Sequence, residues 1–331
     1  MWTIMEYRML GNTGLKVSAV SFGTWAIGGS WGNVDERTAL DGLARAIDAG
    51  VNFFDTADVY GDGRAERLLA QATRGREDEI HIATKFCRKG DIHDPATYSL
   101  GTVRAYCEDS LRRLGREAID LYQVHCPPRA VIERGEVFHV LDELKREGKI
   151  RHYGVSVETV EEGLLAIRHP GVSALQVIFN IFRQKPAREL FPHTGAQGVG
   201  ILVRLPLASG LLTGKFKPDA TFAKDDHRNF NRDGQAFNVG ETFAGLPFTK
   251  GVELAEQLRP IADNRGNMAR AAMRWILDDT RVSCVIPGFK NSAQVEDNLA
   301  ALDVLPFRAE ERRQLEDFYE THVKSFIRGP Y

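Results

Sequence analysis

Three apolar stretches of the sequence end in a polar residue: VNFFD over residues 51–55, HIATK over residues 81–85 and LYQVH over residues 121–125. Each is short and has the composition of a β-strand, and an apolar residue would be less costly to bury at its last position. If the three are neighbouring strands of one parallel sheet, Asp55, Lys85 and His125 meet at its carboxyl edge. The stretches therefore predict both a sheet and the place of a site on it.

Short apolar runs alternate with longer amphipathic stretches along the whole chain, a pattern typical of βα units. It predicts strands over residues 19–22, 52–55, 80–84, 121–124, 153–156, 174–178, 200–203 and 284–286, and helices over residues 36–49, 102–114, 137–147 and 159–168. Eight strands with intervening helices predict an α/β fold, a TIM (β/α)8 barrel, in one domain spanning residues 1–331. A doubly wound open sheet would show the same counts and stays open as an alternative.

Two segments outside this pattern predict the ends of the barrel. Residues 7–10 and 15–18 flank Gly11-Asn12-Thr13-Gly14, which predicts an N-terminal β-hairpin that plugs one mouth of the barrel. Residues 216–248 are rich in Asp, Asn, Gly and Phe without clear periodicity. They predict a long loop on the C-terminal face, of the kind that proteins use for binding.

The composition argues against several classes of protein. The 43 Lys and Arg against 45 Asp and Glu give a net charge of −2, which leaves no surplus to hold a nucleic acid. The four cysteines form no C-x-x-C pair, which favours a reduced, cytoplasmic setting. Glu6 and Arg8 interrupt a possible secretory leader, and Arg204 and Pro206 interrupt residues 199–212, the most apolar later stretch. We expect no membrane segment, no metal site, and a monomer by default.

Tyr60 adds a fourth titratable group to the predicted strand ends. It follows Asp55 by five residues, so its phenol can fold back over the same edge. A free tyrosine has a pKa of about 10, and a cation beside it favours the phenolate. Lys85 supplies this cation, Asp55 holds the ammonium in place, and His125 orients a substrate oxygen. The set predicts proton transfer from Tyr60 to a carbonyl; the hydride must come from a cofactor, because no side chain delivers one.

The sequence resembles the aldo-keto reductase family, from Leu10-Gly11-x-x-Gly14 nearly to the C-terminus. The matching stretches include Ser21-Phe22-Gly23-Thr24-Trp25, Phe54-Asp55-Thr56-Ala57-Asp58-x-Tyr60-Gly61, Ala83-Thr84-Lys85, Asp120-Leu121-Tyr122-x-x-His125, Gly148-Lys149-Ile150-Arg151-x-x-Gly154-Val155-Ser156, Pro206-Leu207-Ala208-Ser209-Gly210-Leu211-Leu212-Thr213-Gly214-Lys215 and Ile286-Pro287-Gly288. The resemblance implies a TIM barrel with an extended nicotinamide cofactor. The family's catalytic tetrad falls on Asp55, Tyr60, Lys85 and His125, the four residues that the strand ends indicate.

The resemblance also implies the contacts of the cofactor, which is expected to be NADP, with NAD as the other possibility. Carboxamide contacts fall on Ser156 and Gln176, pyrophosphate contacts on Leu207, Ser209 and Leu211 with added charge from Lys215, and adenosine contacts on Gly288, Phe289, Lys290, Gln294, Asp297 and Asn298. Lys290 is the candidate for a 2′-phosphate, which a cation would neutralise. Further contacts fall on Thr24, Trp25, Asp55, Arg204, Leu205, Pro206, Gly210 and Pro287. Trp25, Trp31, Tyr60, Phe86 and His125 are expected to line the substrate cleft.

Two positions depart from the family's pattern. Val157 stands where many members have Asn, so one amide contact is missing or is made by another residue. Arg204 stands where many members place an aromatic ring on the nicotinamide, and its planar guanidinium can stack there instead. Cys126, next to His125, suggests a thiol mechanism, but Pro127 and Pro128 follow it and no oxyanion motif accompanies it.

Three functions follow from these observations. The first is NADPH-dependent reduction of an aldehyde or ketone, or the reverse alcohol oxidation. The second is a sugar or alcohol dehydrogenase that prefers NAD. The third is a nicotinamide-binding sensor or interaction protein, similar to the potassium-channel β subunits. All three predict a small carbonyl or sugar substrate or a nicotinamide ligand, and none predicts the identity of the substrate.

Overall fold

A barrel of parallel strands forms the centre of the computed structural model, which describes residues 4–29 and 34–331. The strands are β3 (Phe22–Gly23), β4 (Phe53–Asp55), β5 (His81–Phe86), β6 (Ile119–His125), β7 (Ile150–Ser156), β8 (Val172–Ile178), β9 (Gly200–Arg204) and β10 (Cys284–Val285). Each strand pairs in parallel with the next one along the chain, from β3 to β10. This sequential order confirms the predicted α/β barrel, because a doubly wound sheet reverses its strand order.

The barrel closes between its first and last strands. Val20 forms a parallel bridge with Val285, and Gly23 forms another with Gly288. The first strand covers Phe22–Gly23 rather than the predicted residues 19–22. Its partner β10 spans only two residues, so the residues before β3 reach β10 through an isolated bridge instead of a continuous ladder.

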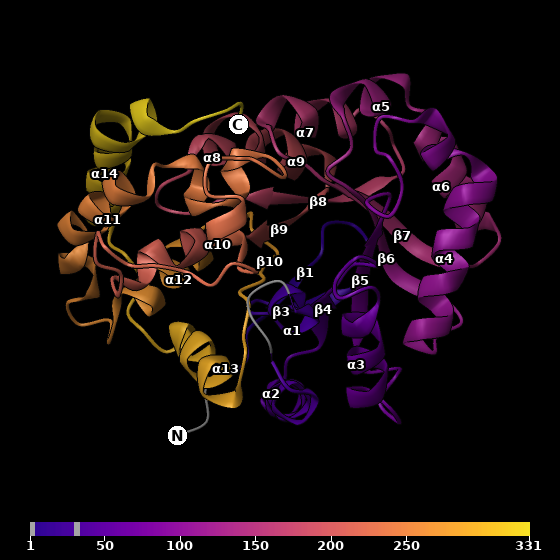
Figure 1. Cartoon of the computed structure of the whole chain (residues 1–331), viewed down its shortest axis with the longest axis horizontal. Helices are drawn as coiled ribbons and strands as arrows, with labels where there is room; N and C mark the ends of the chain where they lie inside the picture. The colour runs from indigo at the N-terminus through magenta and orange to yellow at the C-terminus, as the bar shows by residue number, and fades with distance from the viewer. Residues whose placement is uncertain (1–3, 30–33) are drawn as a thin grey trace.

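Helices surround the strands on the outside, as Figure 1 shows. The α-helices are α1 (Trp25–Gly28), α2 (Glu36–Asp48), α3 (Arg64–Ala72), α4 (Leu100–Leu114), α5 (Arg129–Arg134), α6 (Glu136–Arg146), α7 (Val160–Ala166), α8 (Lys185–Glu189), α9 (Phe191–Gln197), α10 (His227–Phe230), α11 (Phe248–Gln257), α12 (Met268–Leu277), α13 (Ser292–Leu299) and α14 (Ala309–Phe318). Shorter helical turns are η1 (Pro95–Tyr98), η2 (Ala208–Thr213), η3 (Val239–Glu241), η4 (Phe243–Gly245), η5 (Arg259–Ala262), η6 (Ala300–Leu302), η7 (Tyr319–Val323) and η8 (Lys324–Phe326). All four helices predicted by periodicity are present, as α2, α4, α6 and α7. In the described part of the chain, no helix has both the length and the apolar character needed to cross a membrane.

The hairpin of β1 (Tyr7–Met9) and β2 (Lys16–Ser18) closes one mouth of the barrel, as predicted. Leu10 and Val17 are fully buried and pack with the inward-facing side chains of the barrel, such as Phe53. Gly11, at the tip, has a φ of +50°, and a Cβ there would clash with the carbonyl oxygen of Gly198. The turn therefore needs glycine, which lets the hairpin approach the start of β9.

Alternation along the strands separates the inside of the barrel from the layer beneath the helices. Phe53 faces the barrel interior, whereas Phe54 packs in the outer layer. Lys85 and Phe86 are likewise consecutive residues of β5 and point to opposite faces. This alternation matters for the site, because a residue directed outward cannot reach the C-terminal mouth.

The long loop predicted over residues 216–248 ends where α11 begins, and residues 216–247 are here named the cavity loop. They contain α10, η3 and η4, and their aromatic side chains form a small core of their own. Phe222 lies at the centre of this core, with ring centroids 5.3 Å from Phe216 and 5.9 Å from Phe243. The loop lacks periodicity because contacts among its own side chains organise it, rather than one face of a long helix.

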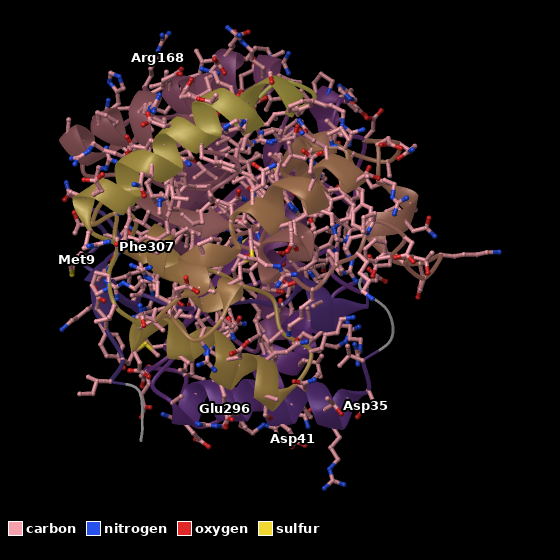
Figure 2. All side chains as sticks on the ribbon, turned by 90° about the vertical axis from the view of Figure 1, so that its left-hand side faces the viewer. Met9, Asp35, Asp41, Arg168, Glu296 and Phe307 are labelled. Carbon is pink, nitrogen blue, oxygen red and sulfur yellow. The ribbon has the colours of Figure 1, made fainter. Side chains whose placement is uncertain are left out.

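Helix α13 packs against α2 and so joins the first and last βα units. In Figure 2, Asp41 of α2, Asp35 at its N-terminus and Glu296 of α13 lie along the same edge of the molecule. The Arg45 Nε atom donates to Glu296 Oε1 at 2.7 Å across this contact. The packing fixes the start of α13, where Lys290 precedes the helix.

Candidate active site

The ends of β4, β5 and β6 bring Asp55, Lys85 and His125 together, as the sequence predicted. Asp55 and His125 are the last residues of β4 and β6, and Lys85 is the last but one of β5. Tyr60 returns over the same mouth from the turn before α3. Its Oη lies 3.4 Å from Lys85 Nζ, and its ring centroid lies 5.9 Å from that of His125.

The Lys85–Asp55 ion pair is buried and fully hydrogen-bonded. Lys85 Nζ donates to Asp55 Oδ2 at 2.5 Å and to the Thr56 carbonyl at 2.9 Å. The other oxygen, Asp55 Oδ1, accepts from Gln123 at 3.2 Å and from Gln176 at 2.7 Å. A buried ion pair persists only when its remaining hydrogen-bonding capacity is met, and these contacts hold the ammonium in one position.

The environment of Tyr60 keeps its phenol protonated in the absence of cofactor. Burial raises its pKa well above the usual value, the negative charges of Asp55 and Glu241 add to this, and Arg204 opposes it. The Lys85 ammonium beside the phenol favours the phenolate, but the effect of burial is larger. The geometry thus places a proton donor at the mouth of the barrel.

His125 is neutral for the same physical reason. Burial lowers its pKa well below the usual value, and the nearby cations Lys85, Arg88 and Arg204 lower it further. Within the described residues its Nδ1 has no hydrogen-bond partner. A neutral imidazole can donate one ring N–H to a substrate oxygen without carrying charge.

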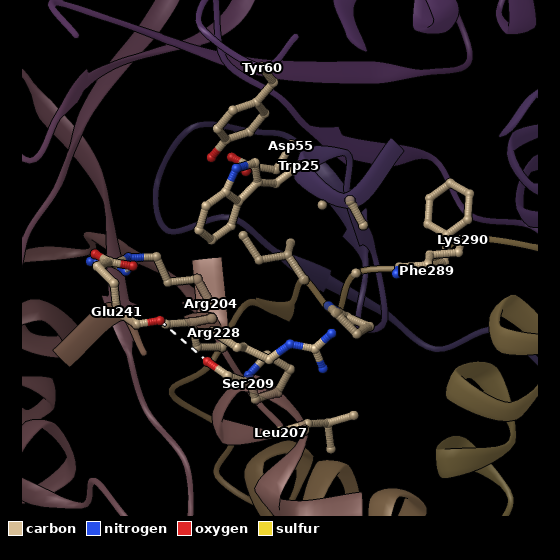
Figure 3. A pocket seen from close by; sticks show the side chains of 18 of the residues that line it. Trp25, Asp55, Tyr60, Arg204, Leu207, Ser209, Arg228, Glu241, Phe289 and Lys290 are labelled. Atoms are coloured by element: carbon tan, nitrogen blue, oxygen red, sulfur yellow. Dashed lines mark hydrogen bonds and ion pairs between the residues drawn. The ribbon is translucent and has the colours of Figure 1, made fainter. Parts of the chain in front are cut away.

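A cavity of about 650 Å³ extends from these groups across the C-terminal face to α13. Figure 3 shows Tyr60, Asp55 and Trp25 at one end, and Lys290 at the other. Its lining includes sixteen of the predicted cofactor residues besides Asp55: Trp25, Gln176, Arg204, Leu205, Pro206, Leu207, Ser209, Gly210, Lys215, Pro287, Gly288, Phe289, Lys290, Gln294, Asp297 and Asn298. Residues predicted from separate parts of the sequence therefore line one continuous space.

Comparison with known proteins agrees with this geometry. The model of the aldo/keto reductase family matches residues 19–320. The chain is 30% identical to aldo-keto reductase YhdN of Bacillus subtilis (strain 168), over 98% of this chain and 97% of that protein. The chain belongs to the aldo/keto reductase family.

Two further relatives of this aldo/keto reductase differ in what their names state. A probable voltage-gated potassium channel subunit beta of Arabidopsis thaliana is 31% identical, over 91% of this chain and 92% of that protein. The structure of the glycerol dehydrogenase AKR11B4 from Gluconobacter oxydans is similar with a TM-score of 0.78, at 29% identity over 98% of both chains. Members with this fold therefore include proteins of different reported roles.

Some residues predicted from the family lie behind the cavity wall rather than on it. Thr24 is fully buried and its hydroxyl donates to the Asp55 carbonyl at 3.1 Å. Ser156 is also buried, and its hydroxyl accepts from the Cys126 thiol at 3.4 Å. Leu211 packs inward against α11. The predicted cofactor contacts of these three residues stay predictions, since none of the three is among the residues that line the cavity.

Phe86 does not line the substrate cleft, so that prediction was wrong. Its ring is fully buried and stacks on Tyr122, with centroids 4.6 Å apart, in the layer beneath the helices. The reason is the strand alternation: Lys85 points to the mouth, so the next residue points away. Trp31, the other predicted aromatic lining residue, lies outside the described residues.

Arg204 lines the cavity, but its guanidinium is already engaged. It forms an ion pair with Glu241 of η3 and donates to the Val157 carbonyl at 3.0 Å. Val157, which replaces the family's frequent Asn, thus contributes its main chain to holding this group. Glu241 was missed by sequence reasoning because its partner is distant in sequence and no motif marks it.

The far end of the cavity contains cations that would meet phosphate groups. Burial lowers the pKa of Lys290, and the neighbouring Arg228 lowers it further while Asp226 and Asp225 raise it. Arg228, from α10, was also missed; its Nη1 lies 3.8 Å from the position that a Gly210 Cβ would occupy. In Figure 3 its guanidinium extends into the cavity between Ser209 and Lys290.

The main chain at η2 takes left-handed conformations but keeps most of its N–H groups for itself. Ala208, Ser209 and Gly210 have φ values of +48°, +55° and +100°. The Ala208 and Gly210 N–H groups donate to the Leu205 and Leu207 carbonyls, at 3.0 and 2.9 Å. Lys215 and Arg228 line the cavity as well, so the charged side chains present fit the diphosphate of a dinucleotide.

The adenosine end is partly organised by the protein's own hydrogen bonds. The Lys290 N–H donates to Gln294 Oε1 at 2.8 Å, and Asn298 Nδ2 donates to the Gly288 carbonyl at 3.2 Å. Asp297 accepts from Arg270 Nε at 2.7 Å, so its carboxylate already has a partner within the protein. Phe289 packs its ring on Phe22, so only its main chain is left for a ligand.

Proposed function

We propose that this protein reduces an aldehyde or ketone with NADPH, using Tyr60 as the general acid, and catalyses the reverse oxidation at the same site. The observation that carries the proposal is the Tyr60 Oη–Lys85 Nζ distance of 3.4 Å, beside the buried Lys85–Asp55 pair, at one end of a 650 Å³ cavity. Family membership supports the reaction class.

The roles of the side chains follow from their charge states. The nicotinamide, when bound, supplies the hydride. Tyr60 donates its phenolic proton to the carbonyl oxygen, and Lys85, held by Asp55, stabilises the phenolate that remains. His125, kept neutral by burial and by its cationic neighbours, donates a ring N–H to the same oxygen and so orients the carbonyl. Because the resting phenol is protonated, it is in the form that donates a proton in the reductive direction.

The replacement Tyr60→Phe tests the catalytic assignment. It removes the proton donor while keeping the ring beside Trp25. We expect kcat to fall by about three orders of magnitude or more and the Kd for NADPH, from quenching of tryptophan fluorescence, to change less than threefold. Tyr7→Phe, on the hairpin far from the cavity, is the matched control and should retain full activity. Substantial turnover by Tyr60→Phe would refute the assignment.

We also propose NADP as the preferred cofactor, with Lys290 and Arg228 as the cations at its phosphates. Both line the cavity, and their proximity is evident in the effect of Arg228 on the pKa of Lys290. Lys290→Met should raise the Kd for NADPH about 10- to 100-fold and leave that for NADH nearly unchanged, because only NADPH carries the 2′-phosphate. Lys324→Met, at a surface pair with Glu320, is the control. Equal effects on both cofactors would contradict the proposal.

Two other functions are supported by relatives. The glycerol dehydrogenase neighbour supports a sugar or alcohol dehydrogenase. A preference of this enzyme for NAD is part of the proposal, and steady-state rates in both directions with NAD and NADP distinguish it from the reductase. The channel-subunit relative supports an interaction protein, for which nicotinamide binding as a sensor is our proposal. A carbonyl substrate screen combined with the mass in solution separates this third function from the two enzymes.

A further inference from the structure

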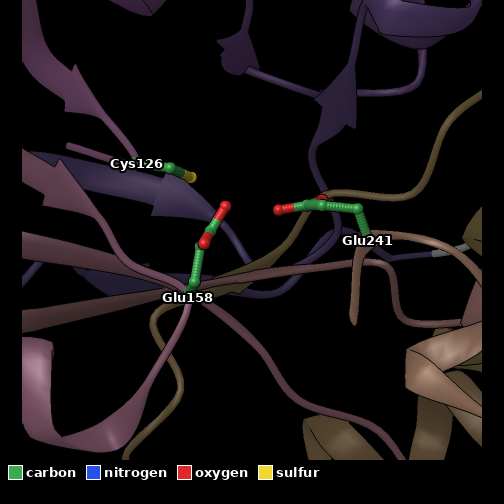
Figure 4. Close-up of side chains that lie close together, drawn as sticks. All are labelled: Cys126, Glu158 and Glu241. Atoms are coloured by element: carbon green, nitrogen blue, oxygen red, sulfur yellow. The ribbon is translucent and has the colours of Figure 1, made fainter. Parts of the chain in front are cut away.

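The cavity contains a second cluster of charged groups beyond the four proposed catalytic residues. Arg88, Cys126, Arg204 and Glu241 line it next to His125. Figure 4 shows the side chains of Cys126, Glu158 and Glu241 approaching one another from three separate segments. None of these residues donates or accepts the proton in the transfer proposed above.

A metal ion does not explain this cluster. Ligand atoms of Cys126, Glu158 and Glu241 lie within 4.8 Å of one another, but guanidinium groups already meet both carboxylates. Arg204 pairs with Glu241, and Arg88 Nη2 lies 3.4 Å from Glu158 Oε1. Burial raises the pKa of the Cys126 thiol to about 11, so the thiol is protonated at neutral pH.

The cluster has more cationic than anionic groups. Arg183 lies directly behind it and donates to the Glu158 carbonyl at 2.9 Å. Three guanidinium groups, those of Arg88, Arg183 and Arg204, therefore surround two carboxylates. Burial and the charge of Glu241 raise the pKa of Glu158, while the hydrogen bond from Asn238 and the charges of Arg204 and Arg88 lower it. The nearby Lys85–Asp55 ion pair adds no net charge, because its two charges cancel.

Arg88 and Arg204 both line the cavity, and each keeps a donor atom without an acceptor among the described residues. The free atom of Arg204, its Nε, is buried, whereas the Arg88 side chain is 23% exposed and so is the more accessible to a ligand. Arg88 Nε donates to the His125 carbonyl at 3.0 Å, and its Nη2 reaches the Cys126 carbonyl and Glu158 at 3.4 Å each. Across residues 4–29 and 34–331, no acceptor meets its Nη1. The Arg88 guanidinium is thus held by the main-chain carbonyls of His125 and Cys126. His125 is the residue whose imidazole is proposed to orient the substrate carbonyl.

We infer that Arg88 binds a carboxylate of the substrate, so that the preferred substrates are aldehydes or ketones bearing an acid group a few atoms from the carbonyl. The inference rests on the proposed function, since it places the reacting carbonyl at Tyr60 and His125. A guanidinium offers only N–H donors, so its ligand must be an acceptor, and a carboxylate also neutralises the excess charge. A neutral hydroxyl would satisfy the donor but leave that charge in place.

The test compares oxo acids with their uncharged counterparts. Glyoxylate, 3-oxopropanoate, 4-oxobutanoate and 5-oxopentanoate are each assayed with NADPH against the corresponding methyl ester, which keeps the carbonyl and the chain. For the wild-type protein, kcat/KM should be at least about tenfold higher for one or more acids than for their esters. In Arg88→Met this acid-to-ester ratio should fall about 10- to 100-fold, and in Arg88→Lys, which keeps the charge but loses the planar fork, by an intermediate factor.

Controls separate the possible failures. Arg129→Met, at an exposed pair with Glu133 on α5, should leave the acid-to-ester ratio unchanged. If Arg88 only supports the His125 main chain, its replacement lowers kcat/KM for acid and ester equally, the ratio stays constant, and the inference is overturned. A wild-type ratio of one or less overturns it too. If neither acids, esters nor a simple aldehyde such as benzaldehyde is reduced, the proposed function itself fails.

Discussion

The two sides of the cavity are built by different means. On one side, Asp55, Lys85 and His125 sit at strand ends, and the register of the parallel ladder sets their spacing. On the other side, Arg228 and Glu241 come from the cavity loop, where no ladder exists. Their positions depend on ion pairs and aromatic contacts between residues distant in sequence, such as Arg204 with Glu241.

This difference predicts a division of labour. Groups on the ladder cannot move without unpairing the sheet, so they suit a proton transfer that needs fixed distances. Groups on the loop can separate when a few side-chain contacts break. Ser209 Oγ donates to the Glu241 carbonyl at 3.3 Å and accepts from the Phe243 N–H at 3.1 Å, which ties the loop to η2. We therefore expect changes on the ladder side to affect kcat and stability, and changes on the loop side to affect cofactor exchange.

The largest effect should come from Lys85→Met. It leaves the Asp55 carboxylate buried without its cation, which costs about 3 to 5 kcal/mol of unfolding free energy. Loss of the ammonium beside Tyr60 should also lower kcat by about a thousandfold. Urea unfolding and turnover at saturating NADPH measure the two effects. The control Lys149→Met, at a surface pair with Glu108, should change the unfolding free energy by less than about 1 kcal/mol. A loss of turnover under tenfold in Lys85→Met would contradict the role given to the ladder side.

A second effect on the same side should appear as a pH dependence of stability. Burial raises the pKa of Asp58 from 3.8 to about 7, and the charge of Glu66 contributes. The folded state therefore retains a proton that the unfolded state releases, so the contribution is favourable below about pH 4 and is lost as the pH rises to about 7. The loss amounts to about 4 kcal/mol for a shift of about three pH units.

Asp58→Asn removes this ionisation. Relative to wild type, its unfolding free energy should increase steadily between pH 4 and 7 and then level off. Asp62 lies four residues away, is exposed and has a lowered pKa. The control Asp62→Asn should therefore show no such gain over this range. Parallel curves for Asp58→Asn and wild type from pH 4 to 8 would show that Asp58 does not titrate as expected.

The smallest of the three effects should come from the loop side. Glu241→Gln removes the charge that pairs with Arg204 while keeping the shape of the side chain. We expect NADPH to dissociate about tenfold faster, a change of about 1.4 kcal/mol, in stopped-flow fluorescence. Glu256→Gln, at an exposed pair on α11, serves as the control. A Glu241→Gln variant that loses turnover without faster release of NADPH would show that the cavity loop affects kcat, as the ladder side is expected to do.

Sequence reasoning predicted the ladder side well because its signals are local. Each strand-end residue stands at a fixed offset within its own apolar run, and the barrel's topology then brings the runs together. The same reasoning failed at Phe86, because alternation along β5 directs it away from the mouth once Lys85 faces inward. It also missed Arg88 and Glu241, since nothing in their local sequence distinguishes them from solvated charges.

The amino-acid sequence by itself determined the alternation of strands and helices, the hairpin plug and the identity of the four converging groups, because apolar periodicity and turn residues act over a few neighbours. The strand order of the folded sheet decided between a barrel and a doubly wound sheet. Only the tertiary structure decided which face each side chain takes at the mouth and which charges meet across the cavity. Arg204 meets Glu241, and Arg88 meets the carbonyl of His125, through contacts between segments that lie 37 residues apart in each case. Such pairings depend on the path of the folded chain and on desolvation, and neither is encoded in a short stretch of residues.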